Sequence, residues 1–313
     1  MLLPKNAKII GQGITGSEGS RAAAWMLEYG TNLIGGVTPG KGGQEVVGKP
    51  VFNTVKEAVE ALGPIDATVV FAPPLRSKDA VFEAIDSGIK FVVVIAEKIP
   101  TKDGALIYAK AKEVGVRVIG PNTTGIINPQ KKIKIGLIGG GEPTRMFLPG
   151  EIAIVSKSGS VAAEIGVLLK RAGLGVSWAV GIGGDRIIGS TYVDVLQELE
   201  NDDQTKASVI FGELGGTYEE QLAEAIKKGV IKKPVIAFIA GEFTLSLPGE
   251  VQFGHAGAII EGDRGKPDHK RQVLKEAGVK VAENFDEIAS LVKEEIKRSS
   301  LRGIRQLADD EAI

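Results

Sequence analysis

Residues 8–20 read KIIGQGITGSEGS, and this stretch decides the fold. The apolar run Lys8–Ile10 predicts a short buried strand, and the pattern over Ser20–Tyr29 predicts a helix. The glycines between them have the spacing G-x-G-x-x-G, which permits a tight turn and lets backbone N–H groups at a helix N-terminus approach a phosphate. The stretch therefore predicts a strand–loop–helix unit that binds a phosphorylated ligand, and the alternative is a glycine-rich turn without a ligand.

Residues 1–128 repeat this strand–helix unit. Apolar runs alternate with helical patterns, as in a mostly parallel sheet whose strands are covered on both faces. Further strands are expected at Asn32–Ile34, Ala67–Phe71, Phe91–Ile95 and Val116–Ile119, and further helices at Val55–Leu62, Lys78–Ser87 and Lys102–Val114. We predict a doubly wound α/β domain.

Residues 129–150 interrupt the pattern with Gly, Pro, Asn and Lys, and predict a linker with room for a short hairpin. Residues 151–297 then predict a second doubly wound domain that ends in the amphipathic helix Phe285–Lys297. Its strands are expected at Glu151–Val155, Val176–Val180, Ser208–Phe211, Val235–Ile239 and Val279–Ala282. The polar tail, residues 298–313, has little periodicity and is expected to fray or to dock on a partner.

Composition excludes several classes of function. The 313 residues include 38 basic and 39 acidic ones, so no basic field is available for nucleic acid or an anionic membrane. Absence of cysteine excludes disulfides, thiol nucleophiles and Cys-ligated metals. The two histidines, His255 and His269, lack neighbours at metal-ligand spacing, so no metal site of this chain alone is expected. Without a signal peptide or a membrane-length apolar run, a soluble cytoplasmic protein is predicted.

The loop after the second expected strand, residues 35–43, reads GGVTPGKGG. A dinucleotide site would place Asp or Glu there to hold ribose hydroxyls, whereas Lys41 suits an additional phosphate, such as that of coenzyme A or NADP. The loop nearly matches a Walker A motif, but Gly42 replaces the Ser or Thr that would hold magnesium. Nucleotide hydrolysis at this loop is not expected, and the alternative interpretation of Lys41 is a solvated loop lysine.

A second anion site is predicted at residues 155–160, VSKSGS, where a strand runs into a helix through hydroxylated residues. Free N–H groups and the hydroxyls of Ser156, Ser158 and Ser160 would form a phosphate cradle. The alternative is a plain serine N-cap. Glu213 follows the strand Ser208–Phe211 at the edge that faces ligands in open sheets, so it could orient a histidine, although many such glutamates are only solvated.

A histidine lies between glycines in residues 251–260, VQFGHAGAII. The flanking glycines leave the imidazole of His255 accessible. A lone histidine is more often structural, but a chain with phosphate cradles and no cysteine offers few other nucleophiles.

Taken together, motifs between about residues 5 and 297 resemble the α subunit of succinyl-CoA synthetase. They are found, in order, at residues 13–17, 35–43, 120–122, 156–159, 181–185, 212–216 and 254–258. The resemblance implies an α/β fold with an N-terminal Rossmann-type CoA-binding domain followed by a flavodoxin-like, doubly wound ligase domain.

The resemblance also implies roles for individual residues. The implied CoA contacts are Thr15, Gly16, Ser17, Glu18, Lys41, Ile95, Ala96 and Glu97. The implied phosphoryl ligands are Ser156, Ser158, Gly159 and Ser160. His255 would be the transiently phosphorylated residue, and Glu213 would hydrogen-bond it and fix its tautomer.

A partner and a mechanism follow from the same resemblance. A β subunit with an ATP-grasp domain would hold ATP or GTP with Mg²⁺, in an αβ pair or its dimer, which agrees with the incomplete Walker motif. The nucleotide would phosphorylate His255, the phosphohistidine would phosphorylate a di- or tricarboxylate, and the CoA thiol would displace phosphate from the acyl phosphate.

Departures from the family pattern bear on the substrate. The usual Thr-Tyr-Glu run is replaced by Ala162-Ala163-Glu164, which is expected to open volume at Ala163 beside the cradle. Residues 251–257 are similar to the synthetase portion of ATP-citrate lyase. We therefore predict citrate as substrate and citryl-CoA as product, with succinate as the alternative because residues 35–43 are of the succinyl type.

Two other classes of function remain as alternatives. The G-x-G-x-x-G spacing and Lys41 would also suit an NADP-dependent oxidoreductase, although no set of residues for hydride transfer is evident. A non-catalytic CoA-binding regulator would explain why this chain lacks a nucleotide-hydrolysing loop.

Overall fold

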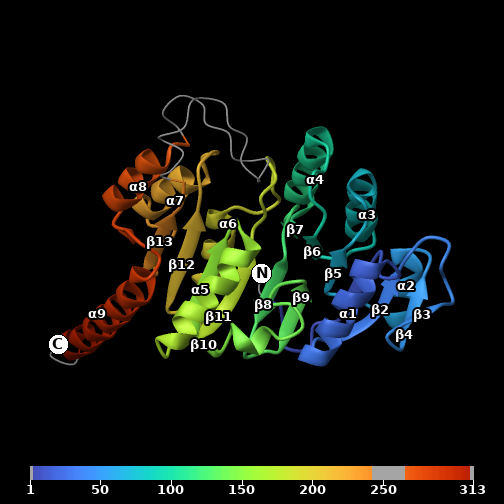
Figure 1. The fold of residues 1–313 in the computed structure, drawn as a ribbon, viewed down its shortest axis with the longest axis horizontal. Helices are drawn as coiled ribbons and strands as arrows, with labels where there is room; N and C mark the ends of the chain where they lie inside the picture. Colours follow the sequence, from blue (N-terminus) through green and yellow to red (C-terminus); the bar gives the residue numbers. More distant parts are fainter. Residues whose placement is uncertain (1–2, 242–264, 311–313) are drawn as a thin grey trace.

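The computed structural model describes residues 3–241 and 265–310, with side chains as far as Arg298. Within these ranges the chain forms two seven-stranded sheets with helices on both faces, as the sequence predicts (Figure 1). The two sheets lie side by side, the first built from the N-terminal third of the chain and the second from the remainder.

The first sheet has the strand order β3-β4-β2-β1-β5-β6-β7, and its neighbouring strands are parallel apart from the hairpin β3–β4. The strands are β1 (Ile9–Gln12), β2 (Leu33–Val37), β3 (Glu45–Val46), β4 (Lys49–Phe52), β5 (Ala67–Val70), β6 (Phe91–Val94) and β7 (Arg117–Ile119). The helices are α1 (Ser17–Tyr29), α2 (Val55–Leu62), α3 (Pro74–Asp86) and α4 (Thr101–Val114).

The second sheet has the order β14-β13-β12-β10-β11-β8-β9, and β8 and β9 are its antiparallel strands. The strands are β8 (Gly125–Asn128), β9 (Ile133–Gly136), β10 (Pro149–Ser156), β11 (Val176–Gly181), β12 (Ala207–Gly212), β13 (Val235–Ile239) and β14 (Lys280–Val281). The helices are η1 (Pro143–Arg145), α5 (Gly159–Arg171), α6 (Tyr192–Leu199), α7 (Tyr218–Lys227), α8 (Pro267–Glu276) and α9 (Glu287–Asp310).

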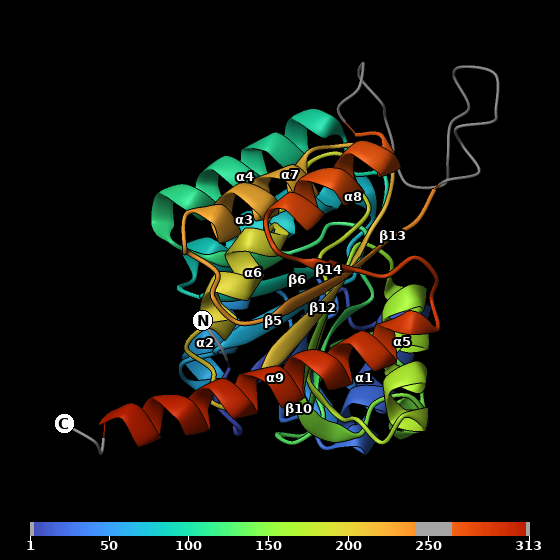
Figure 2. The same ribbon diagram turned by 90° about the vertical axis from the view of Figure 1, so that its left-hand side faces the viewer.

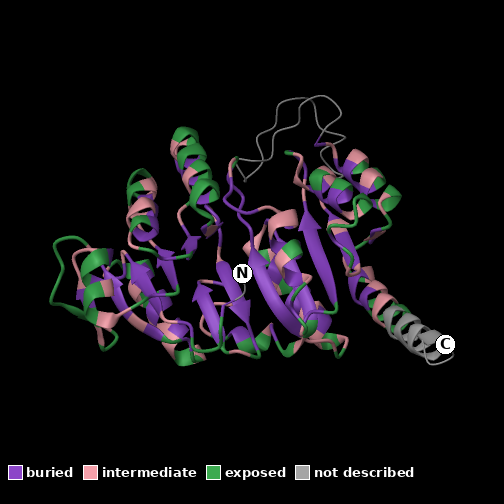
Figure 3. Cartoon of the chain, turned by 180° about the vertical axis from the view of Figure 1, so that it is seen from behind, coloured by how far each residue is buried: buried purple, intermediate pink, exposed green. Residues whose placement is uncertain are grey.

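Alternation along the strands divides the core into layers. On β1, Ile9 faces α1, whereas Ile10 faces α2, α3 and α4. In the second sheet, α5 and α9 cover one face and α6, α7 and α8 cover the other. The layer under α1 is continuous with the layer under α6–α8, so one apolar core runs through both sheets, and the strands are buried almost throughout (Figure 3).

Three segments differ from the sequence-based expectation. Residues 129–150, expected as a linker with room for a short hairpin, contain β9, which forms a hairpin with β8. Both strands belong to the second sheet, which therefore begins at Gly125, within the expected first domain. The hairpin β3–β4 was not expected. The expected polar tail is helical as far as Asp310, and Figure 2 shows α9 continuing past the body of the molecule.

In the described part of the chain, no helix combines the length and the apolar character that a bilayer crossing requires.

Candidate functional site

The loop between β1 and α1 lies at the carboxyl edge of the first sheet. Gly13 has a positive φ of 73° and packs against the backbone of Phe71. A Cβ on Gly19 would lie 2.5 Å from the carbonyl oxygen of Gly13, so this close return of the chain requires glycine. Gly16 is the N-cap of α1 and provides no side-chain acceptor, which leaves the N-terminal N–H groups available for an anion.

The other predicted CoA residues lie along the same edge, because β1, β2, β5 and β6 run parallel. Thr15 and Ser17 flank Gly16, and Ile95 follows β6, where its N–H donates to Val70 O at 3.1 Å. Lys41 lies in an exposed turn after β2, closed by its N–H donating to Thr38 O at 3.0 Å. The exposed Lys41 ammonium is therefore available to a phosphate of a ligand bound along this edge.

A cavity of about 640 Å³ lies between the two sheets and joins the predicted CoA edge to the predicted phosphate cradle. Its lining comes from both domains: Glu18, Phe71, Ala72, Pro73, Pro74, Ile95, Ala96 and Glu97 from the first, and Asn122, Thr123, Thr124, Leu137, Lys157, Ser158, Gly159 and Ser160 from the segments that follow. The cavity thus brings together seven of the predicted site residues, namely Glu18, Ile95, Ala96, Glu97, Ser158, Gly159 and Ser160.

The cradle itself is built at the junction of β10 and α5. Ser158 is the N-cap of α5 and accepts from the N–H of Val161 at 3.5 Å. The hydroxyls of Ser158 and Ser160 are 3.1 Å apart, and Ser156 Oγ donates to Ser158 O at 2.6 Å. Hydroxyls and the N-terminus of a 13-residue helix therefore face the cavity, a set of neutral donors suited to a phosphoryl group.

Glu213 follows β12, next to the strand that leads into the cradle. In the parallel register of β10 and β12, Ser156 lies opposite Phe211, two residues before Glu213. Burial, followed by the carboxylates of Glu219 and Glu213, raises the pKa of the Tyr192 hydroxyl well above its usual range. Glu213 is half-buried, and its charge acts on the buried Tyr192 hydroxyl.

His255 lies outside the described residues, but the chain on either side of its segment is described. A Cβ on Gly241 would be 3.0 Å from a side-chain carbon of Leu214, and one on Gly265 would be 3.2 Å from Gly215 Cα. Gly215 N also donates to Gly265 O at 2.8 Å. The segment that contains His255 therefore starts and ends beside the turn that follows Glu213.

Asp185 joins the two halves at the rim of the site. Its carboxylate accepts from the backbone N–H groups of Lys98 at 3.4 Å and Ile99 at 3.3 Å, directly after Glu97. Burial raises the pKa of Asp185, although the hydrogen bonds from Lys98, Asn122 and Ile99 oppose the rise. This contact fixes the loop after β6 against the second domain.

Residues 120–125, GPNTTG, contribute site residues to which the sequence analysis assigned no role. Asn122, with a positive φ of 58°, and Thr124 both line the cavity. The Thr124 hydroxyl is buried, has no hydrogen-bond partner within the described ranges, and packs against Gly159. In the sequence, the two consecutive threonines after Gly-Pro-Asn were the feature that could have indicated these site residues.

Ala163 lies away from this cavity. It is on α5 and lines a separate hollow of about 330 Å³ together with Met146, Glu164, Val167, Leu168, Arg171, Phe285 and Asp286. The alanine therefore adds no volume to the cavity between the sheets, contrary to the expectation that favoured citrate. The physical reason is that residue 163 lies on the side of α5 that faces the start of α9.

No group of three or more His, Asp or Glu side chains in the described ranges is arranged to hold a metal ion.

Comparison with known proteins gives a separate family match for each of the two domains. Residues 4–98 match the family described as CoA binding domain, and residues 149–294 match the succinyl-CoA ligase like flavodoxin domain. The chain is 46% identical over 293 residues to a succinate–CoA ligase [ADP-forming] subunit alpha 1 of Archaeoglobus fulgidus, which covers 94% of this chain and 97% of the relative. It is 40% identical over 304 residues to a malate–CoA ligase subunit alpha of Methylorubrum extorquens, with 96% and 99% covered.

A similar solved structure is the ATP citrate lyase of Methanothrix soehngenii in complex with citrate and coenzyme A. The TM-score is 0.88 and the identity 28%, over 97% of this chain and 52% of the lyase chain, so this chain spans about half of that protein. These relatives cover 94% and 96% of this chain, and both domains match in the expected order. The chain therefore belongs to the family of succinate–CoA ligase α subunits, and it is a subunit of an acid–thiol ligase.

Proposed function

We propose that this chain is the α subunit of an ADP-forming carboxylate–CoA ligase that acts with a separate β subunit on succinate. The observation that carries the proposal is the cavity of about 640 Å³, because it connects the CoA edge of the first domain to the phosphate cradle of the second. A thiol held at one end can therefore reach an acyl phosphate formed at the other.

In the proposed reaction, the imidazole of His255 takes the γ-phosphoryl group of ATP and ADP leaves. A substrate carboxylate oxygen then attacks the phosphorus, which frees the imidazole and gives an acyl phosphate. The CoA thiolate attacks the acyl carbon and phosphate leaves. Glu213 would hold the imidazole tautomer, while Ser156, Ser158, Gly159 and Ser160 would bind the phosphoryl oxygens.

The nucleotide and its Mg²⁺ are assigned mainly to an ATP-grasp domain of the β subunit. This assignment is supported by the relatives, which are named as α subunits, and by Gly42, which stands where a nucleotide-binding loop would place a hydroxyl for magnesium.

Succinate is preferred over citrate for two reasons. Relatives of nearly the same length are named for succinate and malate, which are four-carbon dicarboxylates. The small side chain of Ala163 adds no room for citrate to the cavity, because Ala163 lines a different hollow. Citrate is the second candidate, favoured by the likeness to a lyase structure that contains citrate and CoA.

Reconstitution with the β subunit tests the proposal. With ATP and CoA, the complex is expected to make a CoA ester from succinate with a higher kcat/KM than from malate or citrate, and His255→Ala is expected to abolish turnover. A higher kcat/KM for citrate would select the second candidate. Ala163→Tyr is expected to leave the succinate-to-citrate ratio unchanged.

Titration of this chain alone tests the first domain. We expect CoA to bind more tightly than dephospho-CoA, and Lys41→Ala to weaken CoA about tenfold while leaving dephospho-CoA unchanged, as expected for one charge-assisted contact. Lys49→Ala, on the neighbouring strand β4, is the matched control. Tighter binding of NADP than of CoA would favour an oxidoreductase instead.

A further inference from the structure

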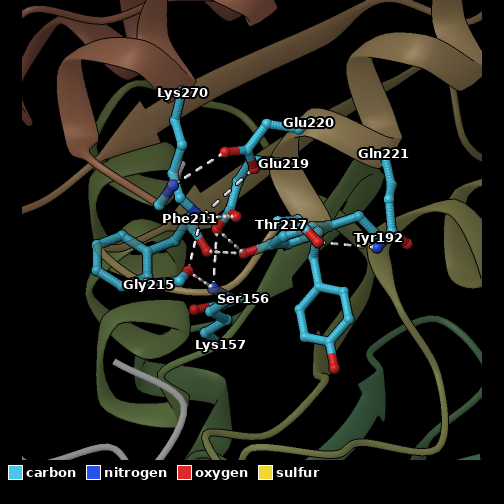
Figure 4. Close-up of polar contacts among 12 residues, drawn as sticks. Ser156, Lys157, Tyr192, Phe211, Gly215, Thr217, Glu219, Glu220, Gln221 and Lys270 are labelled. Atoms are coloured by element: carbon cyan, nitrogen blue, oxygen red, sulfur yellow. Dashed lines mark hydrogen bonds and ion pairs between the residues drawn. The ribbon is translucent and has the colours of Figure 1, made fainter. Parts of the chain in front are cut away.

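A cluster of buried charges includes Lys157, the residue directly before Ser158 of the cradle (Figure 4). Glu219 on α7 and Lys270 on α8 are fully buried, and the side chain of Lys157, between β10 and α5, is 6% exposed. None of these three residues takes part in the reaction proposed above. They come from three separate segments: the junction of β10 and α5, helix α7 and helix α8.

Lys157 and Lys270 share two partners, the carboxylate of Glu219 and the carbonyl oxygen of Gly215. Lys157 Nζ lies 3.0 Å from Glu219 Oε1, and Lys270 Nζ pairs with Glu219 Oε2. Both ammonium groups also donate to the carbonyl oxygen of Gly215, at 3.4 Å from Lys157 and 2.7 Å from Lys270. Burial raises the pKa of Glu219, but the ammonium groups of Lys157 and Lys270 outweigh it and hold that pKa below its ordinary value.

Such a cluster fixes position more than it adds stability, because desolvation of buried charges offsets most of their attraction. Lys157 directly precedes Ser158, the cap of α5, and its N–H donates to Phe211 O at 3.3 Å. Gly215 lies two residues after Glu213. The charges thus connect Ser158 of the cradle to the turn that follows Glu213.

The orientation of Lys157 also has an electrostatic consequence. Its ammonium is directed at Glu219 and Gly215 (Figure 4). It also lies 5.6 Å from the ring centre of Tyr218. The two ammonium groups are balanced by two carboxylates, because Lys270 Nζ also lies 3.7 Å from Glu220 Oε2. A phosphoryl group in the cradle then meets neutral N–H and O–H donors, from which it can be transferred onward.

We propose that Lys157, Glu219 and Lys270 are positioning residues that hold Glu213 at a fixed place relative to the Ser158–Ser160 cradle during phosphoryl transfer. This inference rests on the proposed function. It assigns to Lys157 a role in geometry, although its place beside a phosphate cradle would otherwise predict a phosphate ligand.

The test compares Lys157→Met, Lys157→Arg and Lys270→Met in the complex of this chain with the β subunit. Lys157→Met removes the charge and keeps the length, and leaves Glu219 paired with Lys270. The matched control is Lys233→Met, because Lys233 also donates to two carbonyl oxygens, of Leu199 at 2.6 Å and Asp202 at 2.7 Å, outside this cluster.

Two readouts are measured. Hydrogen–deuterium exchange of the amides in residues 213–217 is expected to become at least about tenfold faster in Lys157→Met and Lys270→Met, and to stay unchanged in Lys233→Met. The kcat is expected to fall about tenfold to a hundredfold, as for a small misplacement of a reacting group, while the KM for CoA changes less than about twofold. Lys157→Arg is expected to restore both readouts in part.

The outcomes separate the two proposals. Unchanged exchange and unchanged kcat in Lys157→Met would overturn the positioning role, and so would a parallel rise in the KM for CoA. If the wild-type complex forms no phosphohistidine and no CoA ester, the proposed function fails, while the exchange data still decide whether the cluster fixes the turn after Glu213.

Discussion

Gly159 opens α5 directly against Thr124, and the absence of a side chain there brings the helix N-terminus up to the cavity. A Cβ at this position would lie 2.7 Å from Thr124 Cβ and would overlap the rest of that side chain. Close approach of two segments, rather than an unusual backbone angle, is therefore what requires glycine.

Gly159→Ala is expected to lower the free energy of unfolding by about 1–3 kcal/mol, the usual cost of overpacking. Gly104→Ala, within α4, is the control, since a Cβ there would meet its nearest atom, Ile187 O, at 3.6 Å. This substitution is expected to raise the free energy of unfolding by about 0.5–1 kcal/mol. Chemical denaturation measures both. Equal effects of the two substitutions would contradict the close contact.

Lys134 on β9 is a buried cation with no hydrogen-bond partner among the described residues. Its side chain is fully buried, and its ammonium lies 5.2 Å from the ring centre of Trp25. Burial lowers the pKa of Lys134 to about 8, against a smaller opposing effect of Glu28. The folded protein therefore binds fewer protons than the unfolded chain between about pH 8 and the ordinary lysine value of 10.5.

Because the unfolded chain binds more protons in that window, stability should rise with pH across it. Lys134→Met is expected to raise the free energy of unfolding at pH 7 by about 1–3 kcal/mol and to flatten this pH dependence. Unfolding at pH 7, 8, 9 and 10 measures the difference from wild type. Lys132→Met, which removes an exposed charge from the same hairpin, is the control, and an equal gain in that variant would refute the assignment.

The start of α9 closes one face of the second sheet. Ile288 and Val292 are fully buried against the layer that contains Ile236 and Phe211. The helix thus contributes its first turns to the core before it extends beyond the body of the molecule (Figure 2).

Ile288→Ala is expected to reduce the free energy of unfolding by about 2–5 kcal/mol, from lost burial and the cavity left behind. Glu294→Ala, on the exposed side of the same helix, should stay within about 0.5 kcal/mol. Thermal and urea unfolding of both variants check this. A small effect of Ile288→Ala would mean that α9 is not part of the cooperative fold.

The sequence was sufficient for the elements whose pattern is local. The strand at Phe91–Val94 and the helix Val55–Leu62 follow from apolar runs and periodicity alone. A short hairpin was expected within residues 129–150, and the hairpin β8–β9 overlaps that range. The sequence did not show that β8 pairs with β11 and so joins the hairpin to the second sheet, because pairing between strands far apart in the chain leaves no local pattern.

The candidate site shows the same limit. Glycine and serine motifs predicted the CoA edge and the cradle, and the structure brings Glu18, Glu97 and Ser158 to one cavity. Ala163 is close to the cradle in the sequence, but this closeness did not show which side of α5 it lies on. The cluster of Lys157, Glu219 and Lys270 was missed because its members lie up to 113 residues apart, from residue 157 to residue 270.

The two domains are joined by polar contacts as well as by a shared apolar core. Arg117 on β7 donates through Nε to Glu198 on α6 at 3.0 Å and through Nη1 to Ser190 Oγ at 3.3 Å. Lys112 on α4 adds a 2.6 Å ion pair with Asp194. We therefore expect the whole molecule to unfold in one cooperative transition.

Arg117→Met is expected to cost about 3–5 kcal/mol, because it leaves partly buried carboxylates of α6 without their guanidinium partner. It should also split or broaden the calorimetric transition. Arg145→Met is the control, since its ion pair with Glu142 is largely exposed and should contribute less than about 1 kcal/mol. Two separate transitions already present in the wild type would contradict the shared core.

Gly241 and Gly265 both lie against the turn of Leu214 and Gly215. This proximity matters for protein engineering. Because Gly241 and Gly265 both lie beside this turn, a replacement for residues 242–264 only has to connect two neighbouring points, and a change in its length is expected to carry a modest entropic cost. Exchanging this segment between relatives named for different acids would show whether acid preference travels with it or stays with the two-domain frame.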